Sequence, residues 1–149
     1  MIMTSLLKSR LLNFYKILTI SKFAFLKIFF DYLRIKNDIA NKQNFIKIIP
    51  NPNDTETYEK YFFLRNNFIQ HGLIRALELD LHKKSNLSIL DLGTGAGYFP
   101  YICNFYGNFA DCLDIAGNEF YDHSTDALKL KKYRHEIMYS NKLPIKKKI

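Results

Sequence analysis

The chain has 149 residues, of which 48% are hydrophobic and 24% are charged, and its formal net charge is +8. This composition is typical of a globular chain with one hydrophobic core, so it excludes intrinsic disorder and collagen-like repeats. The charge is unevenly spread: residues 1–47 and 129–149 are basic, whereas residues 48–128 carry an acidic excess. That distribution argues against a uniformly basic nucleic-acid-binding domain.

The first 35 residues predict a basic amphipathic helix, because apolar side chains recur on one stripe at 100° per residue and Lys16, Lys27 and Arg34 lie opposite. The stripe consists of Leu7, Leu11, Phe14, Leu18, Phe25, Phe29 and Tyr32. Charged residues interrupt every apolar run of transmembrane length. Such a helix needs a partner, and two remain open: the core of this chain or of a second copy, which we favour, or a peripheral membrane contact through residues 1–47.

Residues 50–56 contain two prolines and several polar residues, and we interpret them as a linker between a helical extension, residues 1–49, and a domain over residues 57–149. A second helix is expected from near Thr57, ending close to the cationic, turn-prone residues 83–86. The short apolar run "LSILDL", residues 87–92, then predicts a strand buried on both faces of a parallel sheet.

Three glycines follow this strand in "GTGAG", residues 93–97. Pro100 and Gly107 mark the start and end of the next helix, and a second strand is expected to end at Asp114. A further helix over residues 118–129 and a third strand over residues 134–139 complete the pattern. We therefore predict an α/β, Rossmann-like fold: the first half of a doubly wound, mostly parallel sheet of about three strands, preceded by helices.

A strand, a glycine turn, a helix and a second strand form a unit that suits a nucleoside cofactor, because glycines allow close backbone approach and the helix presents free N–H groups. Asp114 follows Gly93 by 21 residues, the distance at which a carboxylate on the second strand can accept hydrogen bonds from both ribose hydroxyls. A dinucleotide site is disfavoured, because Tyr98 stands where the GxGxxG fingerprint requires a small residue.

The segment "ILDLGTGAGYF", residues 89–99, resembles the first motif of the class I S-adenosylmethionine-dependent methyltransferases, with Asp91 as the acidic residue two positions before the first glycine. The resemblance covers about residues 57–149 and implies S-adenosylmethionine as the cofactor. By that resemblance Gly93, Thr94 and Gly95 contact the methionine end, Asp91 holds its ammonium group, Asp114 binds the ribose and Ile115 borders the adenine. Tyr61 and Phe62, in an aromatic-rich helix, are candidates to cover the cofactor.

The family's sheet continues beyond three strands, so the resemblance also implies a truncated domain whose first strand is an unpaired edge. Two outcomes stay open: a second polypeptide or self-association completes the sheet before methyl transfer can occur, or the chain is a truncated relic of a methyltransferase without turnover of its own. Catalytic residues stay unassigned, because we interpret Glu119, Asp122 and His123 as a solvated helix face. Two alternatives remain open: a non-catalytic interaction or membrane-peripheral protein that retains half of the fold, and an NAD-binding subunit.

The two cysteines, Cys103 and Cys112, are nine positions apart and form no CxxC motif. Because we recognise no secretory signal, we interpret them as core residues in a reducing cytosol rather than as a disulfide or as metal ligands. The four histidines form no metal-binding pattern. We therefore expect a cytoplasmic protein without a metal site.

Overall fold

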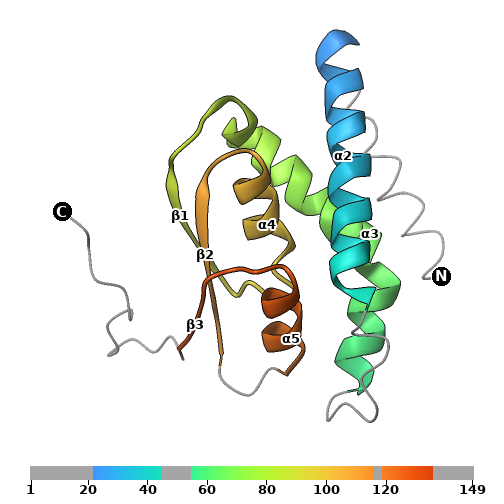
Figure 1. The fold of residues 1–149 in the computed structure, drawn as a ribbon, viewed down its shortest axis with the longest axis vertical. Coiled ribbons are helices and arrows are strands. Elements are labelled where there is room, and N and C mark those ends of the chain that lie inside the picture. Colours follow the sequence, from blue (N-terminus) through green and yellow to red (C-terminus); the bar gives the residue numbers. More distant parts are fainter. Residues whose placement is uncertain (1–21, 45–54, 116–118, 136–149) are drawn as a thin grey trace.

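The computed structural model describes residues 22–44, 55–115 and 119–135. In chain order the elements are α2 (Lys22–Lys42), α3 (Thr55–Glu78), the 3₁₀ helix η2 (Leu81–Lys83), β1 (Ser88–Leu92), α4 (Tyr98–Phe105), β2 (Phe109–Asp114), α5 (Glu119–Ala127) and β3 (Lys132–Arg134). Figure 1 shows the sheet, then α4 and α5 beside it, then α2 and α3. The predicted class is confirmed: helices are followed by three parallel strands in one sheet, consistent with a half Rossmann-like fold.

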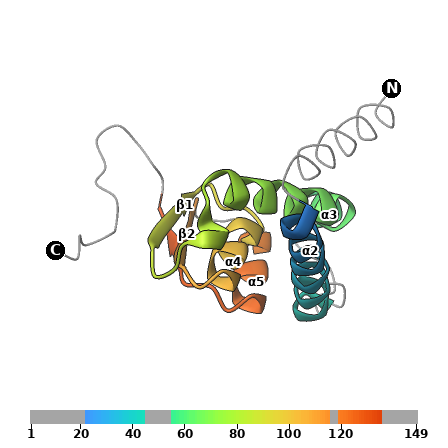
Figure 2. The same ribbon diagram turned by 90° about the horizontal axis from the view of Figure 1, so that it is seen from above.

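The sheet has the order β1-β2-β3, so β2 is central and β1 is at an edge within the described residues. In the register, Asp91 of β1 lies opposite Cys112, and Asp114 of β2 lies opposite Arg134. The edge position of β1 was expected from the sequence, but the prediction that this strand is buried on both faces is wrong. Leu92 is 52% exposed and no residue of β1 is fully buried, because α4 and α5 lie on one side of the sheet (Figure 2).

Helix α2 packs on the chain's own core through Ile28, Ile35 and Ile39, each 3% exposed or less. The predicted stripe is wrong for Phe29, which is 39% exposed. The buried residue is Ile28, one position before Phe29, and at the border of the buried face the Tyr101 hydroxyl of α4 donates a hydrogen bond to Asp38. The rest of the stripe before residue 22 lies outside the described residues.

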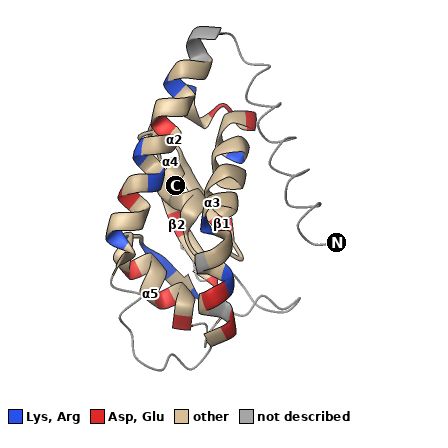
Figure 3. Cartoon of the chain, turned by 90° about the vertical axis from the view of Figure 1, so that its right-hand side faces the viewer, with Lys and Arg blue, Asp and Glu red and all other residues tan. Residues whose placement is uncertain are grey.

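Charged residues of both signs are spread along α2 in Figure 3, so the described part of this helix is a mixed surface rather than a continuous basic one. None of the helices in the described ranges combines the length and the apolar character that crossing a bilayer requires. The partner of α2 in the structure is therefore the domain itself, which was the favoured alternative.

Helix α3 begins at Thr55, two residues before the predicted start and inside the predicted linker, and residues 50–54 lie outside the described part. It ends at Glu78, earlier than predicted, because Asp80 adopts a left-handed conformation with φ +57° and the short η2 follows. Gly72, in the interior of this helix, has a packing role. A Cβ at this position would lie 2.9 Å from Ile102 Cδ1, so glycine allows α3 to approach α4 closely.

The predicted limits of α4 are confirmed: Pro100 lies in its first turn and Gly107, with φ +83°, lies just beyond its end. Helix α5 falls within the predicted range of residues 118–129. Strand β3 starts at Lys132, two residues before the predicted start, and the predicted part beyond residue 135 lies outside the described residues.

Both cysteines are free and fully buried, as expected for core residues. Burial raises the pKa of the Cys103 and Cys112 thiols to about 12. They pack in a single cluster that includes residues of α2, α3, α4, β2 and α5. The cluster holds the sheet against its helices and so fixes the loop that follows β1.

Candidate functional site

The glycine segment, residues 93–97, connects the carboxyl end of β1 to α4 and is tied to the neighbouring strand. The backbone N–H groups of Gly93 and Thr94 both donate to the carbonyl of Leu113, with N···O distances of 2.9 and 3.2 Å. The Thr94 hydroxyl donates to the carbonyl of Asp91 at 2.8 Å and accepts from the Leu113 N–H at 3.1 Å. Thr94 therefore fixes the loop against β1 and β2 through its side chain, a role that sequence reasoning did not assign to it.

The three glycines of the segment all have positive φ, +68° at Gly93, +58° at Gly95 and +78° at Gly97, but different surroundings. Among the described residues, a Cβ on Gly93 would meet nothing within 4 Å, so this part of the structure leaves the backbone open there. A Cβ on Gly97 would lie 2.8 Å from Leu130 Cδ1 and 3.3 Å from Thr125 Cγ2. Gly97 thus serves packing, whereas Gly93 leaves room for a ligand to approach the main chain.

Asp114, at the carboxyl end of β2, lies directly against this loop. Its Oδ2 accepts a hydrogen bond of 2.6 Å from the Gly95 N–H, and its Oδ1 accepts one of 2.8 Å from the Ile115 N–H. Each carboxylate oxygen has a further lone pair, so both can still accept from another donor. The side chain of Ile115 is 58% exposed beside this carboxylate. The structure therefore brings together the two parts of the predicted site, which are separated by 21 residues.

Asp91, near the end of β1, has only 11% of its side chain exposed. Burial raises its pKa, and the nearby Arg75 guanidinium opposes that effect only in part. Arg75 Nη1 lies 3.7 Å from Asp91 Oδ1, and its guanidinium lies over the Phe99 ring at 5.0 Å from the centroid. Sequence reasoning missed Arg75, because its place beside Asp91 depends on how α3 packs across α4.

Tyr61 of α3 covers the glycine loop on the same side as Asp114. Its hydroxyl oxygen lies 2.6 Å from the position that a Cβ on Gly95 would take, so only glycine leaves room for it. The Tyr61 ring stacks on Phe120 with centroids 4.6 Å apart and an interplanar angle of 7°. Burial, and secondarily the charge of Asp114, raise the pKa of Tyr61, so the hydroxyl is a donor. The side chain of Phe62, the other candidate, lies outside what the structure describes.

The predicted solvated face of α5 is wrong for Asp122 and His123. Asp122 has 18% of its side chain exposed and pairs with Lys132 and Arg134 of the adjacent β3. The Nδ1 atom of His123 shares a hydrogen bond with the Tyr58 hydroxyl of α3. Both side chains thus hold α5 to its neighbours. Across the described ranges, no group of three or more His, Cys, Asp or Glu side chains is arranged to hold a metal ion.

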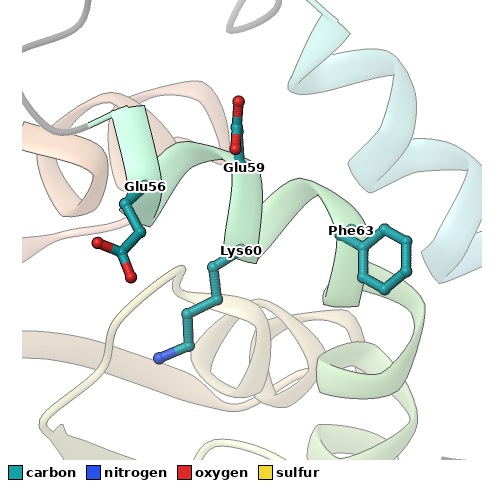
Figure 4. Close-up of a pocket in the computed structure, with 4 residues that line it drawn as sticks. All are labelled: Glu56, Glu59, Lys60 and Phe63. Atoms are coloured by element: carbon teal, nitrogen blue, oxygen red, sulfur yellow. The ribbon is translucent and has the colours of Figure 1, made fainter. Parts of the chain in front are cut away.

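A surface hollow of about 680 Å³ lies along the first turns of α3. Figure 4 shows its lining residues, Glu56, Glu59, Lys60 and Phe63, which all belong to this one helix. A second hollow, of about 600 Å³, lies at the amino end of β2, the end opposite Asp114, and Phe109 and Lys131 are among its lining residues. None of the predicted cofactor residues lines either hollow.

The site that the structure assembles therefore consists of the loop backbone at Gly93 and Gly95, the two carboxylates Asp91 and Asp114, and the covering side chains Arg75 and Tyr61. Its two carboxylates can accept hydrogen bonds at two separate points of one ligand. Comparison of the chain with protein-family models, with curated proteins and with solved structures finds no match in any of the three.

Proposed function

We propose that the chain binds S-adenosylmethionine at the carboxyl ends of β1 and β2 and acts as the cofactor-binding part of a methyltransferase. The observation that carries the proposal is the position of Asp114, whose carboxylate touches the N–H of Gly95 in the glycine loop. A carboxylate at the end of the second strand, next to a glycine turn, suits the two hydroxyls of an unphosphorylated ribose. The resemblance of residues 89–99 to a methyltransferase motif selects this cofactor over a dinucleotide.

The opposite end of the ligand would lie along the open backbone of Gly93 and near Asp91. Asp91 is buried and acidic, and an ammonium group is the charge that such a carboxylate stabilises best. The exposed Ile115 side chain, next to Asp114, offers an apolar border for the base. In this proposal the amino-acid end of the ligand lies at Asp91, the ribose at Asp114 and the base at Ile115, as the resemblance implies.

Methyl transfer from the sulfonium is an in-line displacement in which the acceptor atom forms the new bond to the methyl carbon while the carbon–sulfur bond breaks. An oxygen or nitrogen acceptor also loses a proton to a base. The described residues nominate no base. Ligands in open α/β sheets lie in a crevice between strands whose crossovers run in opposite directions. Because β1 is an edge in the described sheet, we propose that a second polypeptide or a second copy supplies the other wall.

The test is calorimetric titration of the purified chain with S-adenosylhomocysteine, the product form of the cofactor. We expect saturable binding that Asp114→Asn weakens and that Asp111→Asn leaves unchanged. Asp111 lies on the same strand but pairs with Lys131 at 2.7 Å, outside the glycine loop. Circular dichroism of both variants checks that they fold alike. Absence of binding by the folded chain, or tighter binding of NAD than of S-adenosylhomocysteine, contradicts the proposal.

A second candidate function, peripheral membrane contact through residues 1–47, is favoured by one feature of α2. Leu26, Phe29 and Phe30 are 53%, 39% and 59% exposed, and Lys27 beside them is exposed as well. Exposed apolar side chains next to cations suit an anionic bilayer surface. The whole chain should then sediment with phosphatidylserine-containing vesicles at low salt and be released at high salt. Recovery of all the protein in the supernatant at low salt excludes this function.

A further inference from the structure

We infer that Arg75 is a specificity residue that binds the carboxylate of an α-amino-acid group on the ligand, while Asp91 binds the ammonium of the same group. The inference rests on the proposed function, since it concerns the amino-acid end of S-adenosylmethionine. Neither the sequence motif nor the resemblance assigns a role to Arg75. The inference is based on the position of Arg75: this cation from α3 lies at the carboxyl end of β1, beside the buried carboxylate of Asp91 and near the turn at Gly93.

The Arg75 guanidinium is held in place by Asp91 and Phe99, and these two contacts leave N–H donors for a ligand. Its Nη1 atom is 3.7 Å from Asp91 Oδ1, which is an ion-pair distance and longer than a hydrogen bond. The guanidinium carbon lies over the Phe99 ring at 5.0 Å from the centroid, and among the described residues the N–H groups of Arg75 donate no hydrogen bond. The side chain is 60% exposed, and within the described residues the contacts of its guanidinium are Asp91 and Phe99. A planar guanidinium that is anchored beside a ring and keeps N–H donors for a ligand is suited to a bidentate carboxylate.

The charges of the site favour a zwitterion over a single ion at this place. An ammonium beside Asp91 would neutralise a carboxylate that burial penalises, but it would also lie close to the positive Arg75. A ligand that carries a carboxylate on the same carbon removes this repulsion, because each of its charges then faces an opposite one. Among the described residues, nothing lies within 4 Å of the Cβ position at Gly93, two residues after Asp91, so a ligand has room beside this turn.

The inference predicts that Arg75 discriminates between two ligands that share the adenosine part. S-Adenosylhomocysteine carries the amino-acid group, whereas 5′-methylthioadenosine lacks it. We expect Arg75→Ala to lower the affinity for S-adenosylhomocysteine about 10-fold. This is the lower end of the range for a charge-assisted hydrogen bond, because the Arg75 side chain is partly exposed and screened by solvent. Binding of 5′-methylthioadenosine should not change. Arg75→Lys should recover part of the loss, since it keeps the charge but not the fork.

Arg34→Ala is the matched control, because Arg34 also lies over an aromatic ring, that of Phe105, with its guanidinium carbon 5.4 Å from the centroid. This variant removes the same kind of contact on α2 and should leave both ligands unaffected. The measurement is the dissociation constant of each ligand for each variant by calorimetry, at low and at high salt. The effect of Arg75→Ala should shrink as salt rises.

Three results separate this inference from the proposed function. If Arg75→Ala weakens the binding of S-adenosylhomocysteine alone, both the cofactor proposal and the role of Arg75 are supported. If it weakens the binding of the two ligands equally, or of neither, the role of Arg75 is overturned and the cofactor proposal stands. Failure of the folded wild-type chain to bind either ligand overturns the cofactor proposal and this inference with it.

Discussion

Gly72→Ala should destabilise the fold, even though alanine is the better helix former. The close approach of α3 to α4 determines this sign. A Cβ at position 72 would lie 2.9 Å from Ile102 Cδ1 and 3.4 Å from the main-chain Cα of Phe99. Ile102 is fully buried, so its terminal methyl group cannot turn into solvent, and the backbone at Phe99 is fixed within α4.

The size of the effect follows from two opposing contributions. In a helix interior, alanine is favoured over glycine by about 1 kcal/mol. Overpacking of a filled core costs roughly 1–3 kcal/mol, and a middle value of about 2 kcal/mol fits a single methyl group pressed on a buried side chain. The net loss for Gly72→Ala is therefore about 1 kcal/mol of unfolding free energy.

Ile102→Val provides the internal control, because valine has no Cδ1 atom. By itself this change should cost about 0.5–1.5 kcal/mol. In the Ile102→Val variant the 2.9 Å contact between a Cβ at position 72 and Cδ1 is absent. Gly72→Ala should then be neutral or stabilise the fold by up to about 1 kcal/mol. The coupling free energy between the two positions is then about 1–2 kcal/mol, favourable in the double variant.

Urea unfolding followed by far-ultraviolet circular dichroism gives the four free energies, since the chain has no tryptophan to report by fluorescence. Equal m-values across the four proteins are needed for the comparison. If Gly72→Ala changes the stability by the same amount in both backgrounds, the steric contact between α3 and α4 does not govern this position and the reasoning is refuted.

Gly97→Ala should lower the free energy of unfolding by about 2–5 kcal/mol, because it adds overpacking to the strain of a positive φ. Gly93→Ala should lower it by about 1–2 kcal/mol, from the strain alone. Similar losses for the two variants in urea unfolding would contradict the different surroundings of the two glycines. Cys103 and Cys112 should resist Ellman's reagent at about pH 8 in the native chain and react once urea unfolds it, and rapid native labelling would show that these thiols are accessible. Burial raises the folded-state pKa of Asp91, so the folded chain binds this proton more tightly and loses stability as pH rises above about 4. Asp91→Asn should therefore raise the urea midpoint at about pH 7 and leave it unchanged at about pH 3; a lower midpoint at neutral pH would mean that the ion pair with Arg75 outweighs burial.

Local signals in the sequence accounted for the glycine turn, the limits of α4 and the position of Asp114 at the end of β2. Pro100 and Gly107 act through the backbone of their own segment, so they mark the helix wherever it packs. Two parallel strands joined by a helix have their carboxyl ends at the same edge of the sheet. The spacing of 21 residues between Gly93 and Asp114 therefore predicted that the glycine turn and this carboxylate share one edge of the sheet, and the structure adds the hydrogen bond from the Gly95 N–H to Asp114.

Side-chain burial and the pairing of charges were decided only by the tertiary structure. The same periodicity was compatible with burial of Phe29 or of Ile28, and the packing of α2 on the domain selected Ile28. Arg75 met Asp91, and Asp122 met the cations of β3, because of the way α3 and β3 lie beside these residues. A sequence pattern can define the faces of an element, but exposure and charge environment depend on which distant segment covers each face.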